Sequence, residues 1–179
     1  MTTQLEVTPT ASSLPKPAPR PLVARGVLQL YTSLGRASFT PVMAQALRVA
    51  GQGTPVLVVQ FLKGGISQGP ERAVTLGSSL TWVRCGIQRC VDTPHLEPEE
   101  QQALATLWQF TSAAIVSGHY GLVVLDELGL AIKLGLIDEG VVTAMLDDRP
   151  VSMDVIITGP EMPETLIERA DLMTQLRVR

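Results

Sequence analysis

The sequence predicts a doubly wound α/β domain, in which helices cover both faces of a mainly parallel sheet. The strand candidates are continuous apolar runs, as expected for strands that are buried on both faces. Helical patterns lie between these runs, which calls for crossover connections between parallel strands. A chain of 179 residues with 45% apolar residues is also long enough to bury one substantial core.

The first strand, turn and helix are predicted between residues 26 and 51. VLQLY (27–31) is a short apolar run that follows a glycine. A turn is expected around Gly35, and a helix is expected to begin near Phe39. The run MAQALRVAG (43–51) continues that helix and ends at a glycine, which is a common helix terminator.

The middle of the chain supplies two further strands and the most strongly patterned helix. PVLVVQF (55–61) contains no polar residue until Gln60, and LTWVR (80–84) is the next strand candidate. Residues 97–118 form the helix, with Pro98 in the first turn and acidic residues near the positive end of the helix dipole. Its apolar positions recur at helical spacing.

The last third continues the alternation of strands and helices. GLVVLDEL (121–128) is a buried strand that ends in two acidic residues, and residues 139–146 form a helical pattern. MDVIITG (153–159) is the next strand, residues 162–170 look helical, and LMTQLR (172–177) is a short final strand.

Residues 1–21 are predicted to be a disordered leader because they are rich in Pro, Ser and Thr and lack apolar periodicity. Residues 22–179 are predicted to be a single domain. The N-terminus lacks the apolar core of a signal peptide, and charged residues interrupt the longest apolar stretch, so we expect a cytoplasmic protein without a membrane partner.

Composition argues against several classes of site. The net charge of −3 gives no reason to expect a nucleic-acid partner. Cys85 and Cys90 match neither a zinc pattern nor a redox C-x-x-C motif, which favours two reduced structural thiols. His95 and His119 lie in unrelated loops, so no catalytic triad is indicated.

Six segments in order resemble one known family. They are RVAGQG (48–53), VVQFLKG (58–64), VVLDEL (123–128), RP (149–150), VIITG (155–159) and ADLMTQLR (170–177). Together they are similar to the P-loop type ATP:corrinoid adenosyltransferases, which transfer adenosyl from ATP to the cobalt of a reduced corrinoid. The resemblance covers residues 26–177 and implies a P-loop NTPase-like fold and a homodimer. It also marks Glu127, Arg149 and Thr158 as retained family positions.

The phosphate loop departs from the family pattern. The family reads T-G-N-G-K-G-K-T-T where this chain has TSLGRASFT (32–40). Ser38 stands in place of the lysine that reaches the β/γ-phosphates, and Phe39 stands in place of the hydroxyl that coordinates magnesium. Of the family's glycines only Gly35 remains. The loop is therefore predicted to have lost ordinary binding of ATP with magnesium.

Two interpretations of the remaining polar residues stay open. Arg36, with Ser38 and Thr40, forms either a residual anion site or part of an exposed turn. Lys63 follows the second strand as in the family. Asp126 either retains the Walker B role of holding magnesium, or it and its neighbour Glu127 cap the next helix or bind loop amides.

The corrinoid side also differs from the family. In place of an aromatic pair this chain has Ile87 and Arg89, and Pro160 replaces an arginine. The leading hypothesis is a non-catalytic family member, without an assigned cofactor, that has a binding, regulatory or assembly role and possibly another protein partner. The alternative is an active adenosyltransferase that uses ATP, magnesium and a corrinoid through Arg36, Lys63 and Asp126.

Overall fold

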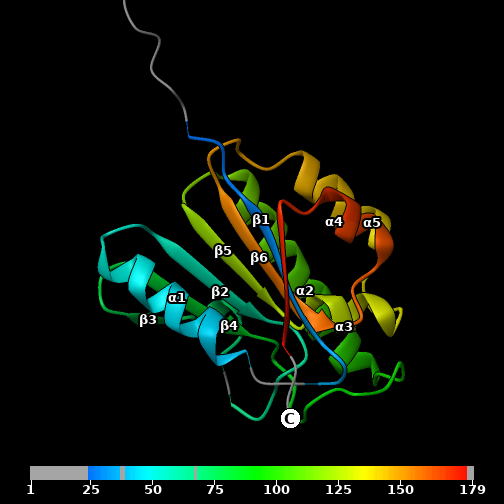
Figure 1. Cartoon of the computed structure of the whole chain (residues 1–179). Helices are drawn as coiled ribbons and strands as arrows, with labels where there is room; N and C mark the ends of the chain where they lie inside the picture. Colours follow the sequence, from blue (N-terminus) through cyan, green and yellow to red (C-terminus); the bar gives the residue numbers. More distant parts are fainter. Residues whose placement is uncertain (1–23, 37–38, 67, 177–179) are drawn as a thin grey trace, which may run out of the picture.

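A seven-stranded sheet with the order β3-β4-β2-β5-β6-β1-β7 forms the centre of the molecule (Figure 1). The computed structural model describes residues 24–36, 39–66 and 68–176. All neighbouring strands are parallel except β3 and β4, which are antiparallel. The strands are β1 (Leu28–Ser33), β2 (Val56–Gln60), β3 (Val74–Leu76), β4 (Leu80–Arg84), β5 (Leu122–Asp126), β6 (Asp154–Pro160) and β7 (Leu172–Leu176). The predicted α/β class is confirmed.

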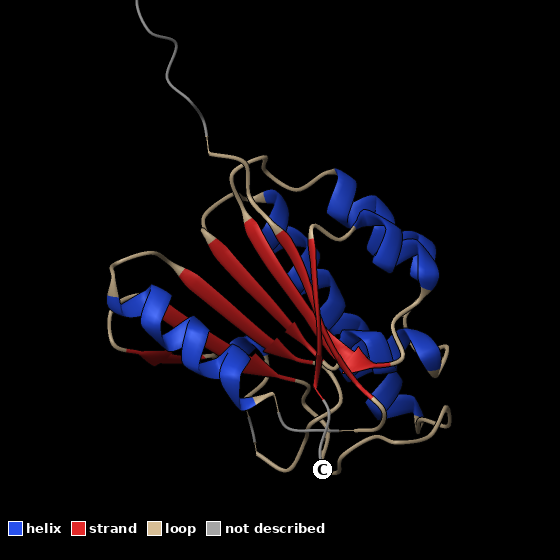
Figure 2. Ribbon diagram, in the orientation of Figure 1, coloured by secondary structure: helices blue, strands red, loops and turns tan. Residues whose placement is uncertain are grey.

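The helices lie on both faces of this sheet, but unevenly (Figure 2). They are α1 (Thr40–Gly51), α2 (Pro98–Val116), α3 (Leu128–Lys133), α4 (Glu139–Asp147) and α5 (Glu164–Arg169), with a short 3-10 turn, η1 (Pro70–Arg72). Helix α1 packs on one face over β2, β4 and β5. The other described helices lie on the opposite face, so the α1 face is left uncovered near β1 and β7 (Figure 1).

Local sequence signals explain where several helices begin. Helix α2 starts with a capping box, in which the side chains of Glu97 and Glu100 each accept a bond from the other residue's backbone N–H. Asp138 caps α4 because its side chain accepts a bond from the Val141 backbone N–H. Helix α1 has no side-chain cap, and Pro41 lies in its first turn.

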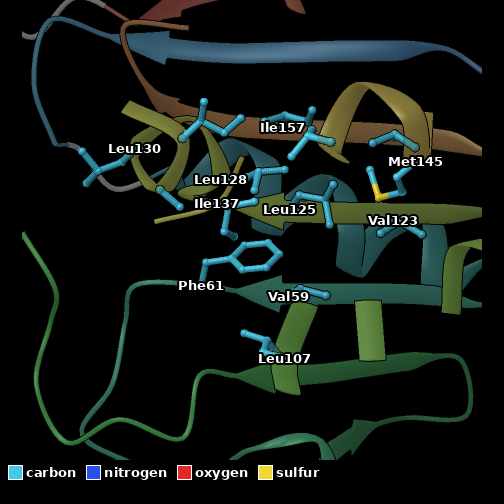
Figure 3. Packing of buried hydrophobic residues seen from close by; sticks show 14 of the residues in the cluster. Val59, Phe61, Leu107, Val123, Leu125, Leu128, Leu130, Ile137, Met145 and Ile157 are labelled. Carbon is cyan, nitrogen blue, oxygen red and sulfur yellow. The ribbon is translucent and has the colours of Figure 1, made fainter. Parts of the chain in front are cut away.

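The larger core lies between the sheet and helices α2 to α5 (Figure 3). Val59 and Phe61 come from β2 and the residue after it, and Val123 comes from β5. Leu107 of α2 and Leu128 of α3 belong to the same buried cluster. A smaller core on the opposite face joins α1 to the sheet.

The predicted strand 121–128 is two residues too long. Strand β5 ends at Asp126, and Glu127 takes a left-handed backbone conformation with φ of 64°. Helix α3, which the sequence pattern did not predict, begins at the next residue, Leu128. The apolar pattern hid this turn because α3 is itself buried between strand and helix layers.

Helix α3 lies in backbone contact with β6. A Cβ added at Gly159 of β6 would lie 2.8 Å from the backbone nitrogen of Leu130 and 2.9 Å from the Cα of Gly129. A Cβ added at Gly129 would lie 2.7 Å from the sulfur of Met162. Neither position has room for a side chain, so β5, α3 and β6 are joined tightly.

The domain prediction divides between described and undescribed residues. The predicted leader 1–21 lies outside the described residues. Strand β3 was missed because it is short and largely exposed. The two cysteines are free, but only Cys85 is buried, whereas Cys90 is exposed and does not contribute to the core. No helix in the described ranges is long and apolar enough to cross a membrane.

Candidate functional site

Polar side chains gather where the parallel strands end, on the face that carries α1. Gln60 ends β2, Asp126 ends β5, and Thr158 lies near the end of β6. All three are buried. Because the carboxyl ends of parallel strands form one edge of the sheet, this edge is the position at which ligands bind in open α/β sheets.

Asp126 is the centre of this group, and both of its carboxylate oxygens are engaged. Oδ2 accepts bonds from Gln60 Nε2 and from Lys63 Nζ, each at 2.7 Å. Oδ1 accepts a bond from the Thr158 hydroxyl at 2.7 Å. Asp126 is 1% exposed, so its charge is balanced by the Lys63 ammonium rather than by water.

Arg36 forms a second ion pair directly beside the first. Its Nε and Nη2 each donate to one carboxylate oxygen of Glu127 at 2.6 Å, which is a bidentate pair. Nη1 donates to the Val91 carbonyl at 2.9 Å, and Nη2 also donates to the Leu62 carbonyl at 3.3 Å. Bonding to Glu127 raises the pKa of Arg36 above its ordinary value.

The geometry of Glu127 makes this pair possible. Its left-handed conformation reverses the chain between β5 and α3. Its backbone N–H donates to the Thr158 hydroxyl at 2.9 Å, which ties it to the Asp126 group. The prediction that Asp126 and Glu127 act as helix caps or bind loop amides is wrong for their side chains: Glu127 occupies the cap position of α3, but its carboxylate binds Arg36.

Phe39 lies inside the molecule at the start of α1. It is 2% exposed and packs in the smaller core with Val42 and Val58. Thr40 begins α1 and is exposed. Gly35 is exposed too, and a Cβ there would meet open space. Ser38, which replaces the family lysine, lies outside the described residues.

The other retained family position, Arg149, lies away from this edge. It follows α4, near the end of the sheet where β6 begins. Its Nη1 donates to the Leu146 carbonyl at 2.8 Å, the last turn of the helix that precedes it. Arg149 therefore stabilises a helix end, whereas Arg36, Lys63, Asp126, Glu127 and Thr158 are brought together.

The predicted replacements on the corrinoid side have structural roles. Ile87 is buried in the larger core. Arg89 binds both carboxylate oxygens of Glu100 at 2.9 Å and donates to the His95 carbonyl at 3.0 Å, so it secures the start of α2. The neighbouring Gln88 lines an open pocket of about 450 Å³ between η1 and α2.

Two residues of the site were missed by sequence reasoning. Gln60 was the one polar residue in an otherwise apolar strand, a signal that a buried partner must satisfy its amide. Trp82, predicted to be in the core, is half-buried and donates its indole N–H to Gln60 Oε1 at 3.0 Å. The polar network therefore reaches from Asp126 through Gln60 to β4.

These residues do not fit an ordinary magnesium site in this arrangement. Asp126 has both oxygens occupied by protein donors, and the neighbouring Lys63 cancels its charge. Phe39, at the position expected to bind the metal, is an apolar core residue. No group of three or more His, Cys, Asp or Glu within the described ranges is arranged to hold a metal ion.

Comparison with known proteins agrees with the fold and with the placement of these motifs. The chain is 30% identical over 162 residues to a corrinoid adenosyltransferase of Pseudomonas aeruginosa, covering 85% of this chain and 75% of that protein. It is 27% identical over 161 residues to the corrinoid adenosyltransferase of Escherichia coli strain K12, covering 86% and 77%. It is 28% identical over 170 residues to protein all2391 of Nostoc sp. PCC 7120, covering 85% of this chain and 44% of that protein.

A family profile matches nearly the whole described domain. The match covers residues 24–179 and is to ATP:corrinoid adenosyltransferase BtuR/CobO/CobP. The matched range contains the sheet, both ion pairs and the polar network around Asp126. The chain therefore belongs to the ATP:corrinoid adenosyltransferase BtuR/CobO/CobP family.

Proposed function

We propose that this chain is a non-catalytic member of its family, with a binding, regulatory or assembly role. The observation that carries the proposal is the pairing of both site cations with buried carboxylates. Arg36 binds Glu127, and Lys63 binds Asp126. The two cations and two carboxylates sum to zero charge, so the sheet edge offers no excess positive charge to a nucleotide phosphate.

The cost of releasing these cations supports the same conclusion. Asp126 and Glu127 are each 1% exposed, so withdrawing either cation toward a ligand leaves an uncompensated charge in the interior. In the family such a ligand would gain a lysine from the loop, whereas the loop here has Ser38. The buried Phe39 side chain removes the adjacent hydroxyl as well.

The second candidate function is an active adenosyltransferase with an atypical loop. The names of the Pseudomonas and Escherichia relatives favour it. A structural observation favours it too, because Arg36, Lys63 and Asp126 all lie at one edge of the sheet. In that case ATP would have to open both ion pairs, and Arg36 would turn from Glu127 to the phosphates.

Ligand-induced stabilisation and a transfer assay separate the two candidates. The full chain is heated with and without ATP, each with and without magnesium, and adenosyl transfer to a reduced corrinoid is measured. A specific ligand at 100 times its dissociation constant adds about 2.7 kcal/mol to the unfolding free energy. The non-catalytic proposal predicts no magnesium-dependent stabilisation and no transfer.

The Pseudomonas relative serves as the positive control in the same transfer assay. Adenosyl transfer by the unmodified chain above a no-protein blank would establish the second candidate. Corrinoid binding without transfer would agree with the first and would name a ligand for the binding role.

A further inference from the structure

Strand β7 presents an open, exposed edge of the sheet. Within the described part of the chain its only strand neighbour is β1, and it ends the strand order. Its residues from Leu172 to Gln175 are exposed although the strand lies beside buried β1. The exposed fractions of Leu172 and Met173 are 58% and 48%. Figure 1 shows β7 as the red strand at this edge.

This edge lacks the features that normally prevent edge strands from pairing. Proteins protect free edges with charged residues, proline, bulges or very short strands. The sequence LMTQL (172–176) contains no charged residue and no proline, and the strand has five residues. The opposite edge, β3, has only three residues. An exposed row of backbone donors and acceptors with apolar side chains is a template for another strand.

The sequence of β7 is suited to pairing with itself. In an antiparallel pair centred on Thr174, Leu172 of one copy lies opposite Leu176 of the other. Both leucines lie on the α1 face of the sheet, because they occupy alternate positions of one strand and Leu172 is in register with Gln29 and Ile156. That part of the face is not covered by α1 (Figure 2). On the other face, Met173 lies opposite Gln175.

We propose that the occupant of this edge is a second copy of the chain, paired through β7 about a two-fold axis at Thr174. An isologous contact of this kind joins two seven-stranded sheets into one continuous sheet. No like charges meet across the ladder. The same register sets Asp171 opposite position 177, which is Arg177 in the sequence and lies outside the described residues.

The size of the contact sets its strength. A five-residue ladder buries less than the roughly 1,000 Å² that marks a stable interface, so the dimer is concentration-dependent. The leucine pairs on the uncovered face add apolar contact to the backbone bonds. This pairing uses no residue of the nucleotide edge and does not depend on whether the chain is catalytic.

Disulfide trapping tests the register directly. Thr174→Cys is made in a Cys90→Ser background, because Cys90 is exposed and would cross-link by itself. In the proposed pair the two Cα atoms at position 174 are about 4.5–5.5 Å apart, within the range that a disulfide spans. Mild oxidation is expected to give a covalent dimer that reductant reverses.

Leu172→Cys in the same background is the matched control. Its two copies lie four residues apart along the strands, about 13 Å, and cannot be bridged. Circular dichroism confirms that each variant is folded. Equal cross-linking of both variants would overturn the register, and no cross-linking of folded Thr174→Cys at high protein concentration would overturn the pairing.

Sedimentation of the unmodified chain provides a second readout. We expect dimer to increase with protein concentration, and Thr174→Lys to remove it because two ammonium groups meet on the axis. Thr75→Lys, on the exposed opposite edge strand β3, is expected to leave the dimer intact. A dimer that persists in folded Thr174→Lys contradicts the proposal. So does cross-linking that appears only after residues 1–21 are deleted, since the leader would then be the occupant.

Discussion

Glu127 is the residue on which the arrangement of the site depends. Its φ of 64° is uncommon for a residue with a side chain, and such conformations persist only where surrounding contacts hold them. Here the backbone N–H is bound by Thr158 and the carboxylate by Arg36. The side chain is therefore a fixed, buried anion between the loop after β1 and the start of α3.

Removing the two partners of this ion pair should have unequal effects on stability. Arg36→Gln leaves the buried Glu127 carboxylate unpaired, and we expect it to lower the unfolding free energy by about 3 kcal/mol. Glu127→Gln leaves only the partly exposed Arg36, which keeps two backbone carbonyl partners, and should cost about 1 kcal/mol. Urea unfolding of both variants measures the difference.

The double variant completes a thermodynamic cycle. With both charges removed, Arg36→Gln/Glu127→Gln should be more stable than Arg36→Gln alone, because no buried charge remains unpaired. An Arg36→Gln variant as stable as the unmodified chain would show that the pair does not hold the loop.

The two thiols should differ sharply in reactivity. Burial raises the pKa of Cys85 from 9.0 to about 11, whereas Cys90 is exposed. At pH 8 a thiol reagent should therefore modify Cys90 in the folded protein and reach Cys85 only on unfolding. Counting modified thiols with and without denaturant gives the result. Modification of Cys85 in the folded protein would contradict its burial.

The raised pKa of Cys85 also predicts a pH dependence of stability. Below pH 9 the thiol is neutral in both the folded and the unfolded chain, so its contribution is fully present. As the pH rises from 9.0 to about 11 the unfolded thiol ionises while the folded one resists, and stability falls. Cys85→Val, which cannot ionise, should lose less stability over this range.

At the scale of elements, the predictable parts were those with a contrast in burial pattern. Strands β2, β5 and β6 were found because both of their faces are buried, which gives continuous apolar runs. Helix α3 was not found because it is buried as well, and its residues continue the apolar run of β5 without a change of period.

The site was predictable as a set of residues but not as a set of contacts. Lys63, Asp126 and Arg36 were candidates because motif positions place them beyond strand ends. The bidentate contact between Arg36 and Glu127 joins residues 91 positions apart and depends on one unusual backbone angle. No local pattern specifies that angle, so a free arginine and a paired arginine look the same in sequence.

Restoring the family residues in the loop tests how much of the element was lost. The variant carries Ser33→Gly, Ala37→Gly, Ser38→Lys and Phe39→Thr, and we expect it to gain ATP binding. It should still fail to adenosylate a reduced corrinoid, because Ile87 is committed to the core and Arg89 to Glu100. Calorimetric titration with ATP and the transfer assay give the two readouts.

This repair has a stability cost that needs its own control. Phe39 is 2% exposed, and truncating a buried phenylalanine costs about 3–5 kcal/mol. A second variant that keeps Phe39 and changes the other three positions separates unfolding from failure to bind. If both variants fold and neither binds ATP, the sheet edge has diverged beyond the loop.

At the scale of the whole molecule, the described core closes without the predicted leader. The buried hydrophobic residues of both clusters begin at Leu28. A chain that lacks residues 1–21 should therefore melt within a few degrees of the full chain. Thermal unfolding by circular dichroism measures this, with the full chain as reference. A large fall in melting temperature would show that the leader packs on the domain.

The backbone contact between Gly159 and Gly129 determines which side of the candidate site is able to move. Strands β5 and β6 and helix α3 meet without intervening side chains, so they behave as one fixed jaw that carries Asp126, Glu127 and Thr158. Arg36 and Lys63 lie on the segments after β1 and β2, outside that contact. Any ligand that enters this edge must therefore displace the cations and leave the anions where they are.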